Sequence, residues 1–306
     1  MLPEIGGAIS LCWEQDPVKR YKSTEDLLTL LSKDRELNIG NHDGAVRFLD
    51  QTNYYRFTGY SRYFQVAPHE GDNSYVEGAS FEQIVDLMAA DDELRIRLLV
   101  PLSELELTLR TRFARISGDI WGNKAFYLDS SNYIPSVHDL DKRIEALRSE
   151  LTNNKSKMVN KYRSPGGEVD NVPVWVAIEA LSFGKISWML ESLKNQSLRE
   201  QISHEYSYPT KTFSSVVQSL SALRNLCAHH GQIWNRPLKS QCPSPLNKRE
   251  RPRDIQFNQL SIFPALLALE KLVCGSAGKS QLATVRRRLS ISNQHTDGIL
   301  RPQAIR

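Results

Sequence analysis

One segment of the sequence combines side chains that can act together on a phosphate ester. Between Leu223 and Arg236 it contains Arg224, Asn225 and His229. A guanidinium neutralises phosphate charge and an imidazole moves protons, and RNA supplies its own nucleophile, the 2′-hydroxyl. The segment therefore predicts RNA cleavage without a metal. In this hypothesis His229 is the general acid or base, Arg224 stabilises the phosphorane and Asn225 orients the imidazole or contacts a phosphate.

The helix expected before this segment places Arg224 in an apolar stripe that begins at Phe213, at about 100° per residue. A charge there is costly unless it is paired, so a structural ion pair with Glu106 or Glu179 is the alternative interpretation. Arg224 and His229 also project about 140° apart on an ideal helix. They converge only if the helix end distorts or a second copy of the chain contributes.

The end of this helix is predicted at His230, with Gly231 as its C-cap. His229 then lies in the last turn, where the helix dipole favours imidazolium. His230 is expected to be a packing residue or a substrate contact. Trp234 could stack on a base, but we favour a core position for it.

The basic residues are concentrated behind this segment. Residues 1–235 carry a net charge of −5 and residues 236–306 one of +9, within an overall +4. Such a stretch can be a solvated tail, but beside an Arg–His pair we interpret it as a surface that gathers RNA by its phosphates. With His230, the predicted RNA-binding residues are Arg236, Lys239, Lys248, Arg249, Arg251 and Arg253.

The elements that must position these side chains are predicted to be helical throughout. The apolar spacing is that of helices almost everywhere, and no alternating strand pattern of useful length is present. A capping box at Ser80–Gln83 opens a long helix to about Ser117, with a kink expected at Pro101. We predict an all-α protein with an N-terminal helical region (1–75), a main helical domain (76–275) and a basic flexible tail (276–306).

An aromatic cluster lies in the N-terminal region, over residues 53–64. It could stack RNA bases, but a packed joint between helices is the favoured interpretation. Residues 66–79 are predicted to be a polar loop.

The composition excludes several classes of protein. Four widely spaced cysteines indicate reduced thiols, and no segment has the length and apolarity of a membrane span or a signal peptide. We therefore expect a cytoplasmic location without membrane association. The chain has neither a phosphate-binding loop nor paired metal-ligand spacings, so no cofactor and no metal are expected.

Four ordered blocks of the sequence resemble the Abi family of bacterial abortive-infection proteins (the AbiD/AbiF-like group), within the HEPN superfamily. The resemblance extends over residues 25–275, and its blocks are 53–60, 107–111, 174–184 and 223–236. It implies a HEPN-type helical bundle with an N-terminal helical extension. Arg224 and His229 then occupy the two defining positions of an R-x4–6-H motif, and Asn225 its polar second position.

The resemblance also implies a function. Many HEPN proteins are metal-independent endoribonucleases in which two copies of the motif face each other across a homodimer. Abi proteins act as toxins in phage defence or toxin–antitoxin systems, some of them inhibited by a cognate small RNA. Two alternatives remain: a non-catalytic RNA-binding scaffold regulated by a small RNA or protein, and a site switched off by covalent modification from a partner enzyme.

Overall fold

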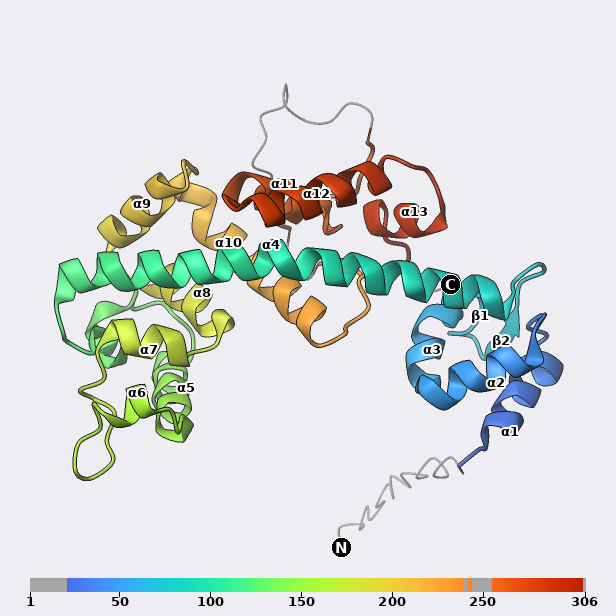
Figure 1. Cartoon of the computed structure of the whole chain (residues 1–306), viewed down its shortest axis with the longest axis horizontal. Coiled ribbons are helices and arrows are strands. Elements are labelled where there is room, and N and C mark those ends of the chain that lie inside the picture. Colours follow the sequence, from blue (N-terminus) through green and yellow to red (C-terminus); the bar gives the residue numbers. More distant parts are fainter. Residues whose placement is uncertain (1–20, 239–240, 244–254, 305–306) are drawn as a thin grey trace, which may run out of the picture. The chain divides into compact units, whose positions relative to one another are not determined.

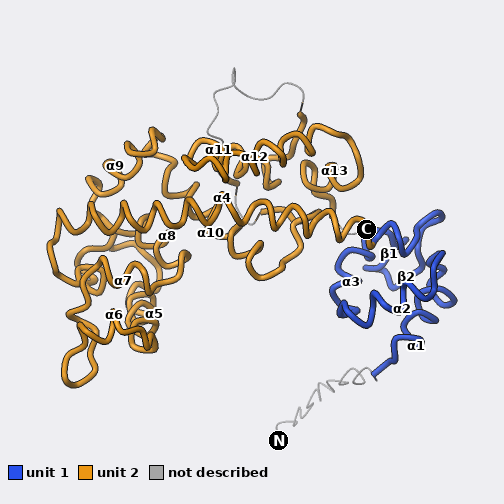
Figure 2. Tube along the Cα trace, viewed as in Figure 1, with its two compact units in different colours: residues 1–84, 306 blue, residues 85–305 orange. Residues whose placement is uncertain are grey.

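The structure is a computed structural model that describes residues 21–238, 241–243 and 255–304. The described chain divides into two compact units, one ending at Ile84 and the other beginning at Val85 (Figure 2). This division lies after the predicted boundary at 75/76. Because the boundary between the two units falls inside a long helix, no loop signal in the sequence marks it.

The described part of the N-terminal unit, from residue 21, contains three short α-helices, two single helical turns and a two-stranded sheet. The helices are α1 (Thr24–Thr29), α2 (His42–Gln51) and α3 (Tyr54–Ser61). The strands β1 (Gln65–Ala67) and β2 (Asp72–Tyr75) pair antiparallel, with Gln65 opposite Tyr75. The expectation of a loop without strands over 66–79 was wrong. Strands of three and four residues are too short to show the alternation that reveals a strand in a sequence.

The aromatic cluster forms a packed joint, as predicted. Phe57, Tyr60 and Phe64 are buried, and the ring of Phe57 stacks on that of Phe81 with 4.7 Å between the ring centroids. Tyr55 remains 72% exposed. Three of the six aromatic residues of the cluster therefore belong to the core of the N-terminal unit.

Helix α4 (Phe81–Trp121) organises the C-terminal unit, and Figure 1 shows the other helices of that unit along it. Its buried stripe includes Leu98, Leu102, Leu105 and Leu109, at the i, i+3, i+4 spacing of a core-facing helix. The helix runs through Pro101 without interruption, so the kink expected there does not break it. The other helices are α5 (Leu140–Asn153), α6 (Lys157–Asn160), α7 (Val174–Ala180), α8 (Phe183–Ser192), α9 (Gln196–Glu205), α10 (Thr210–Ala228), α11 (Phe263–Leu272), α12 (Ser276–Leu289) and α13 (Gln294–Leu300).

Apart from the two short strands, the regular elements of the described chain are helices, and the predicted all-α class is confirmed. None of its helices combines the length and apolarity needed to cross a membrane.

The predicted flexible tail is instead folded. Helices α12 and α13 occupy most of residues 276–300, and Leu282, Val285 and Leu289 of α12 are buried. Glu104 of α4 holds the start of α12, since its Oε1 accepts the backbone N–H of Gly278 at 2.9 Å. The buried positions have helical spacing, but the polar composition around them suggested mobility. Packing against α4 outweighs that composition.

Candidate functional site

Helix α10 ends in a Schellman motif built from the predicted catalytic segment. His229 is the C-cap, and His230 takes the left-handed conformation with φ of 55°. The backbone N–H of Gly231 donates to Leu226 O at 2.8 Å and that of His230 to Cys227 O at 3.4 Å, which is the hydrogen-bond pair that defines this motif. The helix was predicted to reach His230 with Gly231 as the C-cap, whereas it ends at Ala228 with His229 as the C-cap, so both positions lie two residues earlier.

Gly231 is required for another reason. A Cβ atom added there would lie 2.8 Å from Leu226 Cδ2. The glycine therefore permits a close approach of the turn to the helix, while His230 carries the left-handed backbone, a conformation in which His is more often found than most residues.

Arg224 is bound to a buried carboxylate of α4. Its Nε lies 2.8 Å from Glu106 Oε2, and its Nη1 donates to Asn225 Oδ1 at 3.1 Å. Glu106 is only 6% exposed. Of the two acidic partners considered from the sequence, Glu106 is the one that pairs, while Glu179 is exposed on α7. The predicted Glu–Arg pair between helices is therefore present.

The same carboxylate joins a third segment to the site. Glu106 Oε1 accepts from Arg110 one turn later, at 3.2 Å from Nε. Arg110 Nη1 also donates to the carbonyls of Ile178 and Leu181 at the end of α7, the latter at 2.8 Å. Glu106 and Arg110 thus connect α4, α7 and α10, which carry three of the sequence blocks that define the resemblance.

His229 differs from Arg224 in its surroundings. Its side chain is exposed, and within the described residues it has no hydrogen-bond or ion-pair partner, Arg224 included. A single chain therefore holds the guanidinium in a fixed network and presents the imidazole to solvent. Cys227 between them is buried, and burial raises the pKa of its thiol to about 12, so it is no nucleophile at neutral pH.

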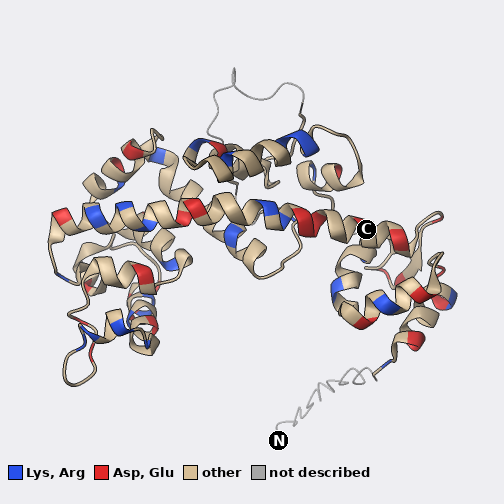
Figure 3. Ribbon diagram, in the orientation of Figure 1, with Lys and Arg blue, Asp and Glu red and all other residues tan. Residues whose placement is uncertain are grey.

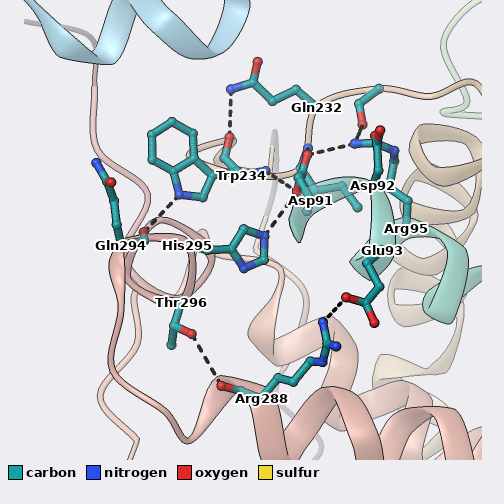
Figure 4. Close-up of polar contacts among 12 residues, drawn as sticks. Asp91, Asp92, Glu93, Arg95, Gln232, Trp234, Arg288, Gln294, His295 and Thr296 are labelled. Carbon is teal, nitrogen blue, oxygen red and sulfur yellow. Dashed lines mark hydrogen bonds and ion pairs between the residues drawn. The ribbon is translucent and has the colours of Figure 1, made fainter. Parts of the chain in front are cut away.

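A buried acid that the sequence analysis missed holds the chain after the motif. Asp91 of α4 is fully buried and accepts the backbone N–H groups of Ile233 and Trp234, each at 3.0 Å (Figure 4). Arg95, 3% exposed, donates to Asp91 at 2.8 Å and to Gly231 O at 3.3 Å. An Asp–Arg pair at i, i+4 within the apolar stripe of the long helix was the signal available in the sequence.

Trp234 is buried, as favoured from the sequence. Its Nε1 donates to Gln294 O at 3.1 Å at the start of α13, and its ring lies so close to Gly298 that a Cβ there would be 2.1 Å from Nε1. Together with Asp91, α13 fixes the segment that leaves the motif.

Of the predicted RNA-binding residues, the structure describes two. His230 and Arg236 are both exposed near the end of α10. The other five, Lys239, Lys248, Arg249, Arg251 and Arg253, lie outside the described residues. Figure 3 marks the basic end of α12, where Arg286 pairs with Glu270 at 3.6 Å and Arg288 pairs with Glu93, whereas Arg287 is exposed.

The network around Glu106 makes a prediction for stability. In Glu106→Gln the buried carboxylate that faces two guanidinium groups loses its charge, and we expect the free energy of unfolding to fall by about 3 kcal/mol. Equilibrium urea unfolding measures it. Glu179→Gln removes an exposed carboxylate and serves as the matched control, with an expected change below about 0.5 kcal/mol. Equal losses of unfolding free energy in both variants would contradict a stabilising role of the Glu106 carboxylate.

Comparison with known families supports the resemblance to the Abi family. A family model described as Abi-like protein matches residues 47–235, more than half of the chain. The match ends at Asn235, directly after the segment that Asp91 and α13 hold. No curated protein and no solved structure matches the chain. The extent of the family match shows that the chain belongs to the family of Abi-like proteins.

Proposed function

We propose that this Abi-like protein is a metal-independent endoribonuclease of the HEPN type. Family membership indicates a role in abortive infection, and the proposal adds the chemistry by which the protein acts there, as a toxin that cleaves RNA. The observation that carries it is the contrast at the end of α10. Arg224 is held rigidly by Glu106 and Asn225, while His229, five residues later, is exposed and unengaged within the described chain.

The roles follow from the chemistry of each group. His229 exchanges a proton with the 2′-hydroxyl or with the leaving 5′-oxygen. Arg224 stabilises the negative charge of the phosphorane through the N–H groups that Glu106 and Asn225 leave available. Glu106 orients that guanidinium from a buried position. Attack by the 2′-oxygen expels the 5′-oxygen, so the products carry a 2′,3′-cyclic phosphate or 3′-phosphate and a 5′-hydroxyl.

The proposal includes a homodimer. Because Arg224 and His229 make no contact within one described chain, a substrate phosphate needs groups from two copies of the motif. The exposed imidazole at the end of α10 is accessible to a second copy. A cognate small RNA that inhibits the toxin would bind the basic stretch of residues 236–306, as the substrate RNA does in this proposal.

Cleavage in the presence of EDTA tests the proposal. A labelled single-stranded RNA is incubated with the purified protein at several protein concentrations, and the product ends are identified by their sensitivity to phosphatase and kinase. We expect cleavage that persists in EDTA and leaves 5′-hydroxyl ends. The cleavage rate is expected to rise with the fraction of dimer, which light scattering measures at each protein concentration. Complete loss of cleavage in EDTA, or products with 5′-phosphate ends, would overturn the mechanism.

A second candidate is a non-catalytic RNA-binding scaffold. The observation that favours it is the charge pairing of Arg224 with Glu106, since a guanidinium already neutralised can serve as a structural tie between α4 and α10. RNA binding without cleavage at any pH between about 5 and 9, a range that spans the ordinary pKa of histidine, would support this candidate and exclude the ribonuclease.

A further inference from the structure

A cavity of about 330 Å³ lies beside α4, α12 and α13, away from the Arg224 network. Its apolar lining includes Leu94 of α4, Leu289 of α12 and Ile291 after α12. Half of the lining residues are polar, and they include Arg97, Arg288 and His295. The volume falls in the range of small-molecule sites, about 300–1,000 Å³, and such sites combine apolar walls with a few polar groups.

The cavity has more positive than negative charge in its wall. Arg97 binds Glu93 Oε1 through Nε at 3.0 Å and Nη2 at 2.7 Å, and Arg288 pairs with the other oxygen of Glu93. The two guanidinium groups lower the pKa of Glu93, so that it is ionised at neutral pH. Two cations against one anion leave an excess positive charge. The Nε and Nη2 groups of Arg288 have no partner among the described residues.

His295 adds an unsatisfied polar atom to the same cavity. Its Nε2 is buried and makes no hydrogen bond, and the nearest acidic oxygen, Asp91 Oδ1, is 3.7 Å away. Figure 4 shows the imidazole between Asp91 and Thr296, with Arg288 nearby. A buried donor or acceptor without a partner destabilises the folded chain.

We propose that this cavity binds a single nucleotide, either free or as part of an RNA chain. The guanidinium group of Arg288 matches a phosphate, to which arginine donates two parallel hydrogen bonds. The base would lie against Leu94 and Leu289, and it would cover Ile291, which is 60% exposed at the rim.

The position of the cavity gives its occupant an influence on the motif. His295 faces Asp91, and Asp91 holds the backbone of Ile233 and Trp234, close behind His229. A nucleotide that contacts His295 therefore stabilises the arrangement of α13 and of the segment that leaves α10. The proposal goes beyond RNA cleavage, since neither Arg224 nor His229 takes part in binding.

Binding is measured by calorimetry on the full chain that carries both Arg224→Ala and His229→Ala, so that no substrate is consumed. The probes are adenosine and uridine monophosphates, inorganic phosphate and a short single-stranded RNA. Arg288→Gln is the test variant, and Arg287→Gln is its matched control, because Arg287 is an exposed neighbour outside the lining of the cavity. Thermal unfolding of each variant without ligand verifies that it is folded.

We expect a mononucleotide to bind at least tenfold more weakly to the Arg288→Gln variant and within twofold of normal to the Arg287→Gln variant. His295→Gln tests the second contact and is expected to weaken binding as well. If the short RNA binds but the mononucleotides do not, and RNA binding depends on Arg288 in the same way, the result supports the site and identifies RNA as the source of the nucleotide. Equal affinity for inorganic phosphate and nucleotide, or binding that is indifferent to Arg288, would overturn the proposal. RNA cleavage is measured separately on protein that keeps Arg224 and His229. The nucleotide-binding proposal and the ribonuclease proposal can therefore fail independently.

Discussion

Replacement of His229 by alanine is expected to slow RNA cleavage by about 10²–10⁴-fold, the usual contribution of a general acid or base. The side chain is exposed and has no partner within the described residues, so its removal costs no packing and breaks no hydrogen bond. We therefore expect the melting temperature to change by less than a few degrees. Single-turnover cleavage of a labelled RNA, measured beside thermal unfolding, separates loss of chemistry from loss of folding.

Two controls distinguish this role from a general effect of removing a histidine. His204→Ala removes an exposed histidine at the end of α9 and is expected to leave cleavage unchanged. His230→Asn tests the neighbouring imidazole, and asparagine tolerates the left-handed backbone of that position. Cleavage that survives in His229→Ala but is lost in His230→Asn would assign the proton transfer to His230 instead.

Replacement of Asp91 by alanine is expected to lower the free energy of unfolding by about 3–5 kcal/mol, the range for removing one partner of a buried ion pair. Arg95 would keep its ion pair with Asp92 but lose the buried carboxylate of Asp91. The backbone N–H groups of Ile233 and Trp234 would lose their acceptor. Equilibrium urea unfolding measures the loss. Because the same contacts hold the segment behind the motif, RNA binding or cleavage should weaken even where the variant remains folded.

The control for this variant lies one and a half turns earlier on the same helix. Asp86 is an exposed aspartate of α4, and Asp86→Ala is expected to change stability by no more than about 0.5 kcal/mol. Asp91→Asn keeps the shape of the side chain and one carbonyl oxygen, so it should recover part of the loss. A stability of Asp91→Ala equal to that of Asp86→Ala would show that the buried acid is not needed.

Local patterns were sufficient for the helical class and for the approximate location of the main helices. The apolar periodicity that predicted a long helix from the capping box at Ser80 corresponds to α4, and the helix expected after Pro209 corresponds to α10. These elements have long, regular stripes, so their period is visible in the sequence. The same is true of the aromatic cluster, whose density indicated the core that Phe57 and Tyr60 form.

Short or polar elements were less accessible. The strands β1 and β2 have too few residues for a pattern, and α9 lies in a polar segment for which no helix was predicted. The apolar positions of α12 were obscured by the basic residues around them. For α9 and α12, contacts with α4 supply stabilisation that local propensity lacks.

The sequence by itself determined which groups are present for the proposed chemistry: an arginine, an asparagine and two histidines at the end of one helix, followed by a basic stretch. Only the tertiary structure decided how they are held. Glu106 was one of two candidate partners for Arg224, and the buried contact selects it. Asp91 reaches Ile233 and Trp234 across more than a hundred residues. Such partners are chosen by the need to neutralise a charge or satisfy a backbone group out of water, and that need exists only once folding has buried them.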